Sequence, residues 1–293
     1  LGALLIGSGI ILLFAHNWDA LSRPARAVLS ACPLALAAAL SFAALLKNGG
    51  AAWREAAGLF HALAVGASVA LIGQTYHVSS DLPSFLLTWA LLVLPLAFLL
   101  RSTGAYLIYL ALACGWSGAA QSSYGQAAAF WLLLLPAALR LAHLARASRD
   151  SVETVISLAG MLAALCVSTG LAFERTVPGL WIVAYSALLS GAGLLGLCLY
   201  GERDGWNNLP KAFGVAGMTV LAYCFTWTSM WHEIGWEHLR HGGQHRLWGV
   251  WMDGGITLAF LAGWALAAVK AFRRDSFEAA TLAAFPLLAT LCF

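Results

Sequence analysis

Charged residues are scarce in this chain, and their scarcity excludes an ordinary water-soluble domain. Lysine, arginine, aspartate and glutamate make up 10% of the 293 residues, whereas hydrophobic residues make up 61%. A soluble domain is about a quarter charged and about half apolar. Most of the surface must therefore face lipid, which predicts an integral membrane protein. A transmembrane barrel does not fit, because its segments of about ten residues alternate polar and apolar positions, and the apolar runs here are continuous and about twice as long.

Basic clusters and paired cysteines are also missing. The formal net charge of +3 is spread over loops, so the chain has no basic block with which to bind nucleic acid. The six cysteines all lie within apolar runs, and no C-x-x-C pair is present. We interpret them as small packing groups, since a disulfide framework needs cysteines in loops.

Catalytic signatures are absent as well. The sequence has no P-loop, no G-x-S-x-G elbow, no dinucleotide fingerprint and no pair of carboxylates within one apolar run. The missing P-loop counts against an ATP-driven motor. No apolar run carries an acidic residue at its centre, which counts against a proton-driven transporter but not against a facilitator. We therefore expect a protein that is not an enzyme, with an enzyme assembled from several loops as the alternative.

What the sequence does contain is a series of long apolar runs. Backbone groups in lipid must form hydrogen bonds within their own segment, so each run is expected to be a helix. The predicted fold class is an all-α polytopic transmembrane bundle of about eleven spans of about 17 to 23 residues. It would form one integral membrane domain over residues 1–293, with both ends cropped inside apolar runs. The spans are expected at residues 1–15, 25–46, 56–73, 84–100, 104–120, 127–144, 152–173, 179–200, 211–231, 250–272 and 277–293.

Basic residues in the short loops predict which side of the membrane each loop faces. One alternate set of loops holds eleven of the sixteen lysines and arginines. These are Lys47, Arg54, Arg101, Arg140, Arg146, Arg149, Arg203, Lys211, Lys270, Arg273 and Arg274. Positively charged loops stay in the cytoplasm, so this set is expected inside. The N-terminal side of the first span is then cytoplasmic, and the loops after the odd-numbered spans face outward.

Small residues recur every fourth position on two expected spans. The third span has Gly58, Ala62, Gly66 and Ala70, and the eighth has Ala192 and Gly196. Residues of this size at this spacing let two helix backbones approach closely, which favours helix association in lipid. We therefore expect the third span at the centre of the bundle.

A hairpin repeat is also visible over residues 1–46 and 56–100. His16 and Asp19 follow the first span, and His77 and Asp81 follow the third. In each case the next apolar run carries a proline followed by Leu-Ala. Repeats of this kind often frame a binding site in membrane proteins.

The most informative polar stretch follows the third span. Gln74, Tyr76, His77 and Asp81 lie there between two strongly apolar runs, and the stretch has no lysine or arginine. Ser80 or Asp81 could cap the next helix, which is the structural interpretation. Capping does not explain Tyr76 and His77. The functional interpretation is a polar ligand held by hydrogen bonds.

Three further residues extend this candidate ligand site. In the AHNWD stretch, His16 and Asp19 are close enough in sequence to form a hydrogen bond, and such a pair can relay a proton or hold a small ligand. Asp253 lies at the outer end of the tenth span, where an acidic group is costly unless it is paired or faces water. The alternatives are a histidine satisfied in the headgroup layer and a capping role for Asp253.

Two of these stretches carry a family resemblance. They are AHNWD after the first span and GQTYHVSSDLPSFLLTWALLVLPLAFLLRS across the third and fourth. Over about residues 1–101 the chain resembles a family of bacterial multi-pass membrane proteins, domain of unknown function 2157. The resemblance implies many helices and a bacterial inner-membrane location, and it implies no reaction, ligand or catalytic residue. Family members usually have a cytoplasmic segment before the first span, which agrees with a cropped start.

The histidine-rich loop at residues 231–249 is the candidate for metal chemistry. His238, His241 and His245 could contribute to a zinc site, which takes three or four such ligands. A Gly-Gly pair would break a helix before His245, and the H-E-x-x-H order of zinc hydrolases is absent. Tryptophans bracket the loop and favour the headgroup layer. We interpret it as a hydrated interfacial loop, with zinc binding or pH sensing as alternatives, and expect no other cofactor.

These features together predict a protein that binds or transports a small polar ligand from the outer face. Its site would consist of His16, Asp19, Gln74, Tyr76, His77, Asp81 and Asp253. One alternative is an envelope metalloprotein or membrane enzyme that uses the histidine-rich loop. Another is a scaffold for partner membrane proteins or further copies of the chain. The lipid bilayer is a partner in every case.

Overall fold

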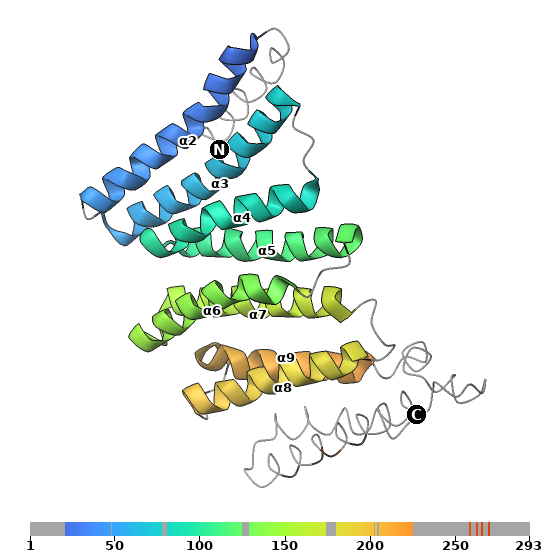
Figure 1. The fold of residues 1–293 in the computed structure, drawn as a ribbon. Coiled ribbons are helices and arrows are strands. Elements are labelled where there is room, and N and C mark those ends of the chain that lie inside the picture. The colour runs from blue at the N-terminus through green and yellow to red at the C-terminus, as the bar shows by residue number, and fades with distance from the viewer. Residues whose placement is uncertain are drawn as a thin grey trace, which may run out of the picture. The chain divides into compact units, whose positions relative to one another are not determined.

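The computed structural model is helical throughout the part of the chain that it describes. That part is residues 21–47, 49–77, 81–124, 129–173, 180–201, 203 and 205–224, with four isolated positions between 258 and 269. These ranges contain eight α-helices, one short 3-10 helix and no strand (Figure 1), which confirms the all-α prediction. The chain divides into two compact units, Leu1–His143 and Leu144–Phe293.

The first unit is built around a central helix. Its described helices are α2 (Arg23–Leu46), α3 (Ala51–Tyr76), α4 (Leu82–Leu99), α5 (Thr103–Tyr124) and α6 (Phe130–Ala147), the last of which runs past the unit boundary. α3 packs against α2, α4 and α5, so the helix with the stripe of small residues is central to the described part of this unit. Its predicted position at the centre of the whole bundle stays a prediction.

Small residues bring α3 into close contact with its neighbours. Ala62 is fully buried, and a Cβ atom added to Gly66 would overlap the indole ring of Trp89 on α4. The indole Nε1 of Trp89 donates to the carbonyl oxygen of Ala62 at 2.8 Å. A Cβ atom added to Gly58 would lie 2.5 Å from Ser102, which directly precedes α5. The predicted stripe is therefore a contact surface of α3.

Two prolines inside helices share one arrangement of hydrogen bonds. Proline has no N–H and its ring displaces the preceding turn, so carbonyl groups there need donors from elsewhere. The carbonyl three residues before Pro33 of α2 accepts the hydroxyl of Ser68 of α3 at 2.7 Å. The carbonyl three residues before Pro136 of α6 accepts the hydroxyl of Tyr109 of α5 at 2.6 Å. A hydroxyl on a neighbouring helix thus stabilises each interrupted helix.

The second unit contains a tight helix pair. Its described elements are α7 (Val152–Phe173), α8 (Leu180–Tyr200), the 3-10 helix η3 (Gly205–Asn208) and α9 (Leu209–Cys224). α8 packs against both α7 and α9. A Cβ atom added to Gly214 of α9 would lie 2.6 Å from the carbonyl oxygen of Leu189 and 2.7 Å from the backbone nitrogen of Gly193, both on α8. The two backbones are therefore in direct contact. Of the seam predicted for the eighth span, Gly196 also takes part, because a Cβ atom added there would lie 2.5 Å from the backbone nitrogen of Lys211 on α9.

Asn208 joins the end of α8 to the start of α9. Its side chain is fully buried, and its Nδ2 donates to the carbonyl oxygens of Gly196 and Gly201, each at 3.2 Å. Its Oδ1 accepts the backbone N–H of Lys211 at 3.3 Å. One side chain therefore satisfies backbone groups at both helix ends, which would otherwise lack partners.

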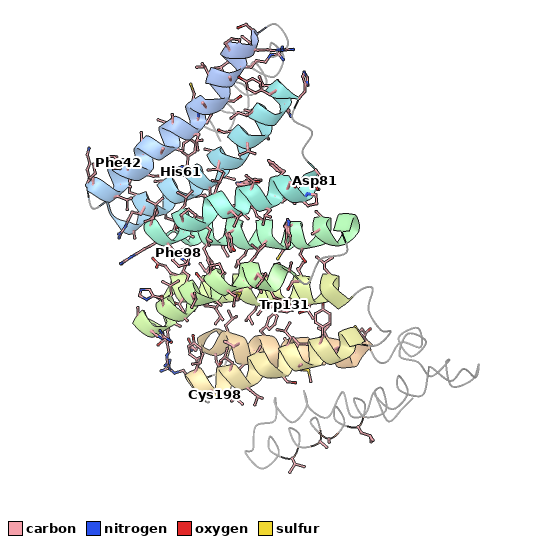
Figure 2. All side chains as sticks on the ribbon, in the orientation of Figure 1. Phe42, His61, Asp81, Phe98, Trp131 and Cys198 are labelled. Atoms are coloured by element: carbon pink, nitrogen blue, oxygen red, sulfur yellow. The ribbon has the colours of Figure 1, made fainter. Side chains whose placement is uncertain are left out.

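Large apolar side chains point out of the helices. Phe42 is 64% exposed, Phe98 is 44% exposed and Trp131 is 40% exposed (Figure 2). The contacts between helices are instead made largely by small and hydroxyl-bearing residues. This inversion of the soluble pattern fits a protein whose helices face lipid.

Five of the described helices are long and apolar enough to cross a membrane, namely α2, α3, α4, α6 and residues Val152–Leu171 of α7. The expected count of about eleven spans is not supported. α5 falls outside this set because tyrosines, glycines and a buried serine lower its hydropathy, and these groups serve packing. The apolar parts Ala187–Tyr200 and Leu209–Leu221 of α8 and α9 are shorter than a span. The spans expected at 1–15 and 277–293, and most of that at 250–272, lie outside the described residues.

Candidate functional site

The junction between α3 and α4 holds the described part of the predicted ligand site. α3 ends at Tyr76, and His77 follows as its C-cap in the left-handed conformation, with φ of 51°. The backbone N–H of His77 donates to the carbonyl of Gly73, which ends the helix. Histidine enters this conformation more readily than most residues other than glycine. Asp81 lies four positions after His77, so their Cα atoms are at most about 14 Å apart.

Asp81 begins α4 at the N-cap position (Figure 2). Its backbone carbonyl accepts the N–H of Phe85 at 3.1 Å, and Pro83 lies in the first turn. The predicted capping position is confirmed, but the Asp81 side chain forms no capping hydrogen bond. The carboxylate lies at the positive end of the helix dipole, which stabilises its negative charge.

Three polar side chains at the end of α3 are exposed. Tyr76 is 57% exposed, and Gln74 and His77 are also exposed. Thr75, in contrast, is 2% exposed and donates its hydroxyl to the carbonyl of Leu71 at 2.8 Å. Among the residues that the structure describes, the side chains of Gln74, Tyr76 and His77 form no hydrogen bond. Their donors and acceptors are therefore accessible at the helix end.

A serine and a histidine inside the first unit resemble a nucleophile and its base. Ser41 Oγ of α2 and His61 Nδ1 of α3 are 2.9 Å apart (Figure 2). Ser41, however, is 6% exposed and lies within α2, where backbone N–H groups bond within the helix and cannot form an oxyanion hole. The pair therefore fits an interhelical hydrogen bond and not a catalytic dyad.

At the opposite end of α3, a carboxylate caps α5. The oxygens of Glu55 accept the backbone N–H groups of Thr103 at 2.7 Å and of Gly104 at 2.5 Å. Negative charge at a helix N-terminus is stabilised by the helix dipole. Glu55 thus occupies the donors that an anionic ligand would need, and this helix end is a structural link. The sequence gives no local signal for it, because Glu55 and Thr103 are far apart in the chain.

Arg140 corrects one assignment made from the sequence. It was counted among the loop cations, yet it lies within α6 and is 5% exposed. Its Nε donates to the carbonyl of Ala97 in the last turn of α4 at 3.1 Å, and its guanidinium lies 4.7 Å from the ring centroid of Tyr106. A cation at a helix C-terminus and over an aromatic face is stabilised by both.

The remaining predicted site residues lie outside the described part of the chain. They are His16, Asp19, Asp253 and the candidate zinc ligands His238, His241 and His245. Where the structure describes the chain, no three histidine, cysteine, aspartate or glutamate side chains are grouped as a metal ion requires. The zinc alternative for the histidine-rich loop stays a prediction.

Comparison with known proteins gives a family match that covers about the N-terminal third of the chain. Residues 1–106 match the family described as "Predicted membrane protein (DUF2157)", which confirms the predicted resemblance. The match covers α2, α3, α4 and the start of α5, and therefore includes the α3–α4 junction. The chain matches no curated protein and no solved structure.

Proposed function

We propose that this membrane protein binds a small polar ligand at the α3–α4 junction and admits it from the outer side of the membrane. One observation carries the proposal: Gln74, Tyr76 and His77 expose side chains without a hydrogen bond to any described residue. Deeper in the first unit, Ser41 and His61 are instead bonded to each other between α2 and α3. The helix end is therefore where hydrogen-bonding capacity is left for a ligand.

The chemistry of the junction limits the class of ligand. The amide of Gln74, the hydroxyl of Tyr76 and the imidazole of His77 each donate and accept hydrogen bonds, and the carboxylate of Asp81 accepts them. No lysine or arginine lies between residues 73 and 82. The site therefore favours a neutral or cationic solute with hydroxyl, amide or amine groups over an anion.

The proposed orientation places the junction outside the inner membrane of a bacterium. Lys47, Arg54 and Arg101 lie at the α2–α3 and α4–α5 connections, which are the helix ends opposite the junction. Loops rich in lysine and arginine are retained in the cytoplasm. The chain would then cross the membrane several times, with the α3–α4 junction open to the outer side.

The proposal is tested by thermal unfolding of the purified protein in detergent with a panel of small polar solutes. The panel consists of amino acids, sugars, polyols and short amines. A solute that binds the folded state raises the unfolding midpoint, because binding adds to the free energy of unfolding. The double variant His77→Asn with Asp81→Asn should need at least about ten times more solute for the same shift, which is a loss of about 1.4 kcal/mol in binding.

Asparagine is chosen because it preserves the backbone roles of both positions. It tolerates the left-handed conformation of His77 and is a favourable N-cap in place of Asp81. Thr88→Ala is the matched control, since Thr88 lies on α4 and its hydroxyl donates to the carbonyl of Ser84 in its own helix. The site assignment is rejected if the double variant responds to the solute as the control does, or if no solute shifts the midpoint of the unsubstituted protein.

A further inference from the structure

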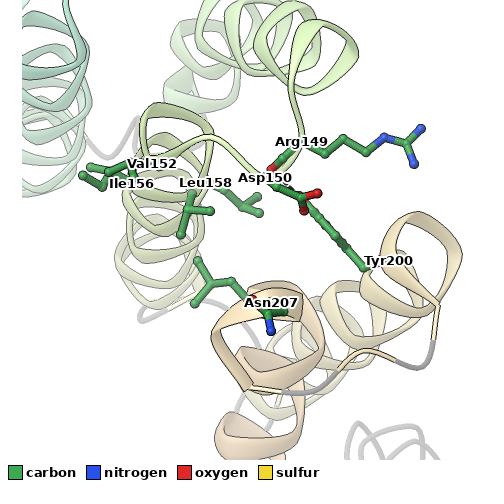
Figure 3. A pocket seen from close by; sticks show the side chains of 9 residues that line it. Arg149, Asp150, Val152, Ile156, Leu158, Tyr200 and Asn207 are labelled. Atoms are coloured by element: carbon green, nitrogen blue, oxygen red, sulfur yellow. Dashed lines mark hydrogen bonds between the residues drawn. The ribbon is translucent and has the colours of Figure 1, made fainter.

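A cavity lies in the second unit where α7 begins and α8 ends (Figure 3). Its volume is about 210 Å³. Val155 and Leu158 of α7 contribute apolar side chains to it, whereas Ile156 is directed to the opposite side of α7 from Leu158 (Figure 3). Asp150 also lines it, and the Arg149 side chain extends outward, away from Leu158 and Asn207. The cavity thus combines an apolar surface with charged groups.

Hydrogen bonds hold the polar side of the cavity in place. The Tyr200 hydroxyl at the end of α8 donates to the backbone carbonyl of Arg149 at 3.3 Å. A terminal nitrogen of the Arg149 guanidinium donates to the carbonyl of Leu199 at 2.9 Å. These two bonds link the start of α7 to the end of α8. The Arg149 side chain is therefore positioned by the fold although it is exposed.

Of the charged residues that line the cavity, Arg149 is the one that can bind an anion. Asp150 is bound by Arg203, whose NH1 lies 3.2 Å and 3.3 Å from the two carboxylate oxygens. That pair neutralises Asp150. Arg149 uses one N–H on the carbonyl of Leu199, and a guanidinium carries five N–H donors, so donors remain for a phosphate.

The cavity lies where the residues of the chain change from polar to apolar, at the start of α7. The apolar stretch of α7 begins at Val152, directly after Ser151, which caps the helix through a hydrogen bond from the N–H of Thr154 to its hydroxyl at 3.2 Å. Val152 is 73% exposed and Ile156 is 42% exposed. A span that starts at Val152 would have this level of α7 where acyl chains meet headgroups, and apolar side chains are exposed there.

We infer that this cavity binds a phospholipid, with its phosphate at Arg149 and part of an acyl chain against Val155 and Leu158. A cavity of 210 Å³ is smaller than the roughly 300 to 1,000 Å³ typical of sites that enclose a whole small molecule. A cavity of this volume can hold a segment of a longer ligand, the rest of which continues into the bilayer. The first turn of α7 adds the positive end of a helix dipole on the same side. This site is separate from the proposed solute site in the first unit.

The test measures phospholipid retention by native mass spectrometry of the whole protein. Delipidated protein in detergent is titrated with phosphatidylglycerol, and the lipid-bound fraction is followed. Arg149→Gln should weaken binding about tenfold, because a charge-assisted hydrogen bond to phosphate is lost. Arg149→Lys should retain most of the affinity. Val155→Phe and Leu209→Trp should each weaken binding at least about tenfold by filling the cavity, which both residues line.

Matched controls separate this site from lipid that coats any membrane protein. Arg146→Gln removes an exposed charge near the end of α6, and Val167→Phe enlarges an exposed residue further along α7. Neither should change lipid retention more than about twofold. Leu209→Trp keeps the test decisive if Val155→Phe does not fold, since Leu209 lines the cavity and is already partly exposed. The thermal midpoint of each variant reports whether it is folded.

Two results would overturn the inference. Equal retention by the unsubstituted protein, Arg149→Gln and the cavity-filling variants would show a nonspecific lipid shell. The second result would come from a titration with inorganic phosphate in place of phosphatidylglycerol. If phosphate alone binds as tightly and is lost in Arg149→Gln, while phosphatidylglycerol gains nothing from the cavity, then the site takes an anion and not a phospholipid.

Discussion

A polar side chain on a helix in lipid is costly unless a neighbouring group satisfies its hydrogen bonds. Ser68 and Tyr109 donate to carbonyl groups near prolines of adjacent helices, and Trp89 donates to a carbonyl of α3. Each of these residues therefore links two helices. Tyr76 and His77 differ from them, since they are exposed at a helix end. This difference separates residues that hold the bundle together from residues available to a ligand.

Arg140 gives a prediction about stability. Arg140→Ala removes the hydrogen bond to Ala97 and the contact with the Tyr106 ring from a side chain that is 5% exposed. We expect the free energy of unfolding to fall by about 2 to 3 kcal/mol. Thermal or denaturant unfolding in detergent measures it. Arg146→Ala, at an exposed position near the end of the same helix, should change stability by less than about 0.5 kcal/mol. Equal effects of the two variants would refute the structural role of Arg140.

Among the elements, α3 and α5 extend at both ends beyond the apolar runs that predict them. The run expected at residues 56–73 corresponds to α3 (Ala51–Tyr76), and the run at 104–120 corresponds to α5 (Thr103–Tyr124). Apolar residues mark only the part of a helix in the hydrocarbon, whereas backbone hydrogen bonds continue into the headgroup layer. The polar last turn of α3, which carries the candidate site, is helical for this reason. Hydropathy alone placed it in a loop.

The stripe of small residues on α3 gives a prediction with an internal control. A Cβ atom at Gly66 would overlap the Trp89 ring, whose indole nitrogen is anchored on Ala62, so the ring cannot easily move away. Gly66→Ala should therefore lower the free energy of unfolding by about 1 to 3 kcal/mol. Gly73 lies on the same helix with nothing within 4 Å of an added Cβ atom. Gly73→Ala should be neutral or stabilising by up to about 1 kcal/mol. An unfolding midpoint of Gly73→Ala below that of Gly66→Ala would contradict the close packing of α3 on α4.

At the scale of the whole molecule, composition predicts the class well and the internal chemistry poorly. The all-α fold of the described residues, the close packing of α3 within the first unit and the seam between α8 and α9 follow from apolar runs and residue spacing. The capping of α5 by Glu55 and the contact of Arg140 with α4 do not, because each joins residues that are far apart in the chain. Of the predicted ligand site, Gln74, Tyr76, His77 and Asp81 are described at one junction. That this junction binds a ligand stays a prediction.

The central claim is that the α3–α4 junction opens on the outer side of the membrane, and cysteine labelling tests it most directly. His77→Cys and Arg54→Cys are each compared with the unsubstituted chain, whose own cysteines give the background signal. With a membrane-impermeant maleimide on intact cells, we expect labelling of His77→Cys. Arg54→Cys, at the other end of α3, should be labelled only after permeabilisation. Labelling of Arg54→Cys in intact cells, with His77→Cys protected until permeabilisation, would reverse the orientation and contradict the account.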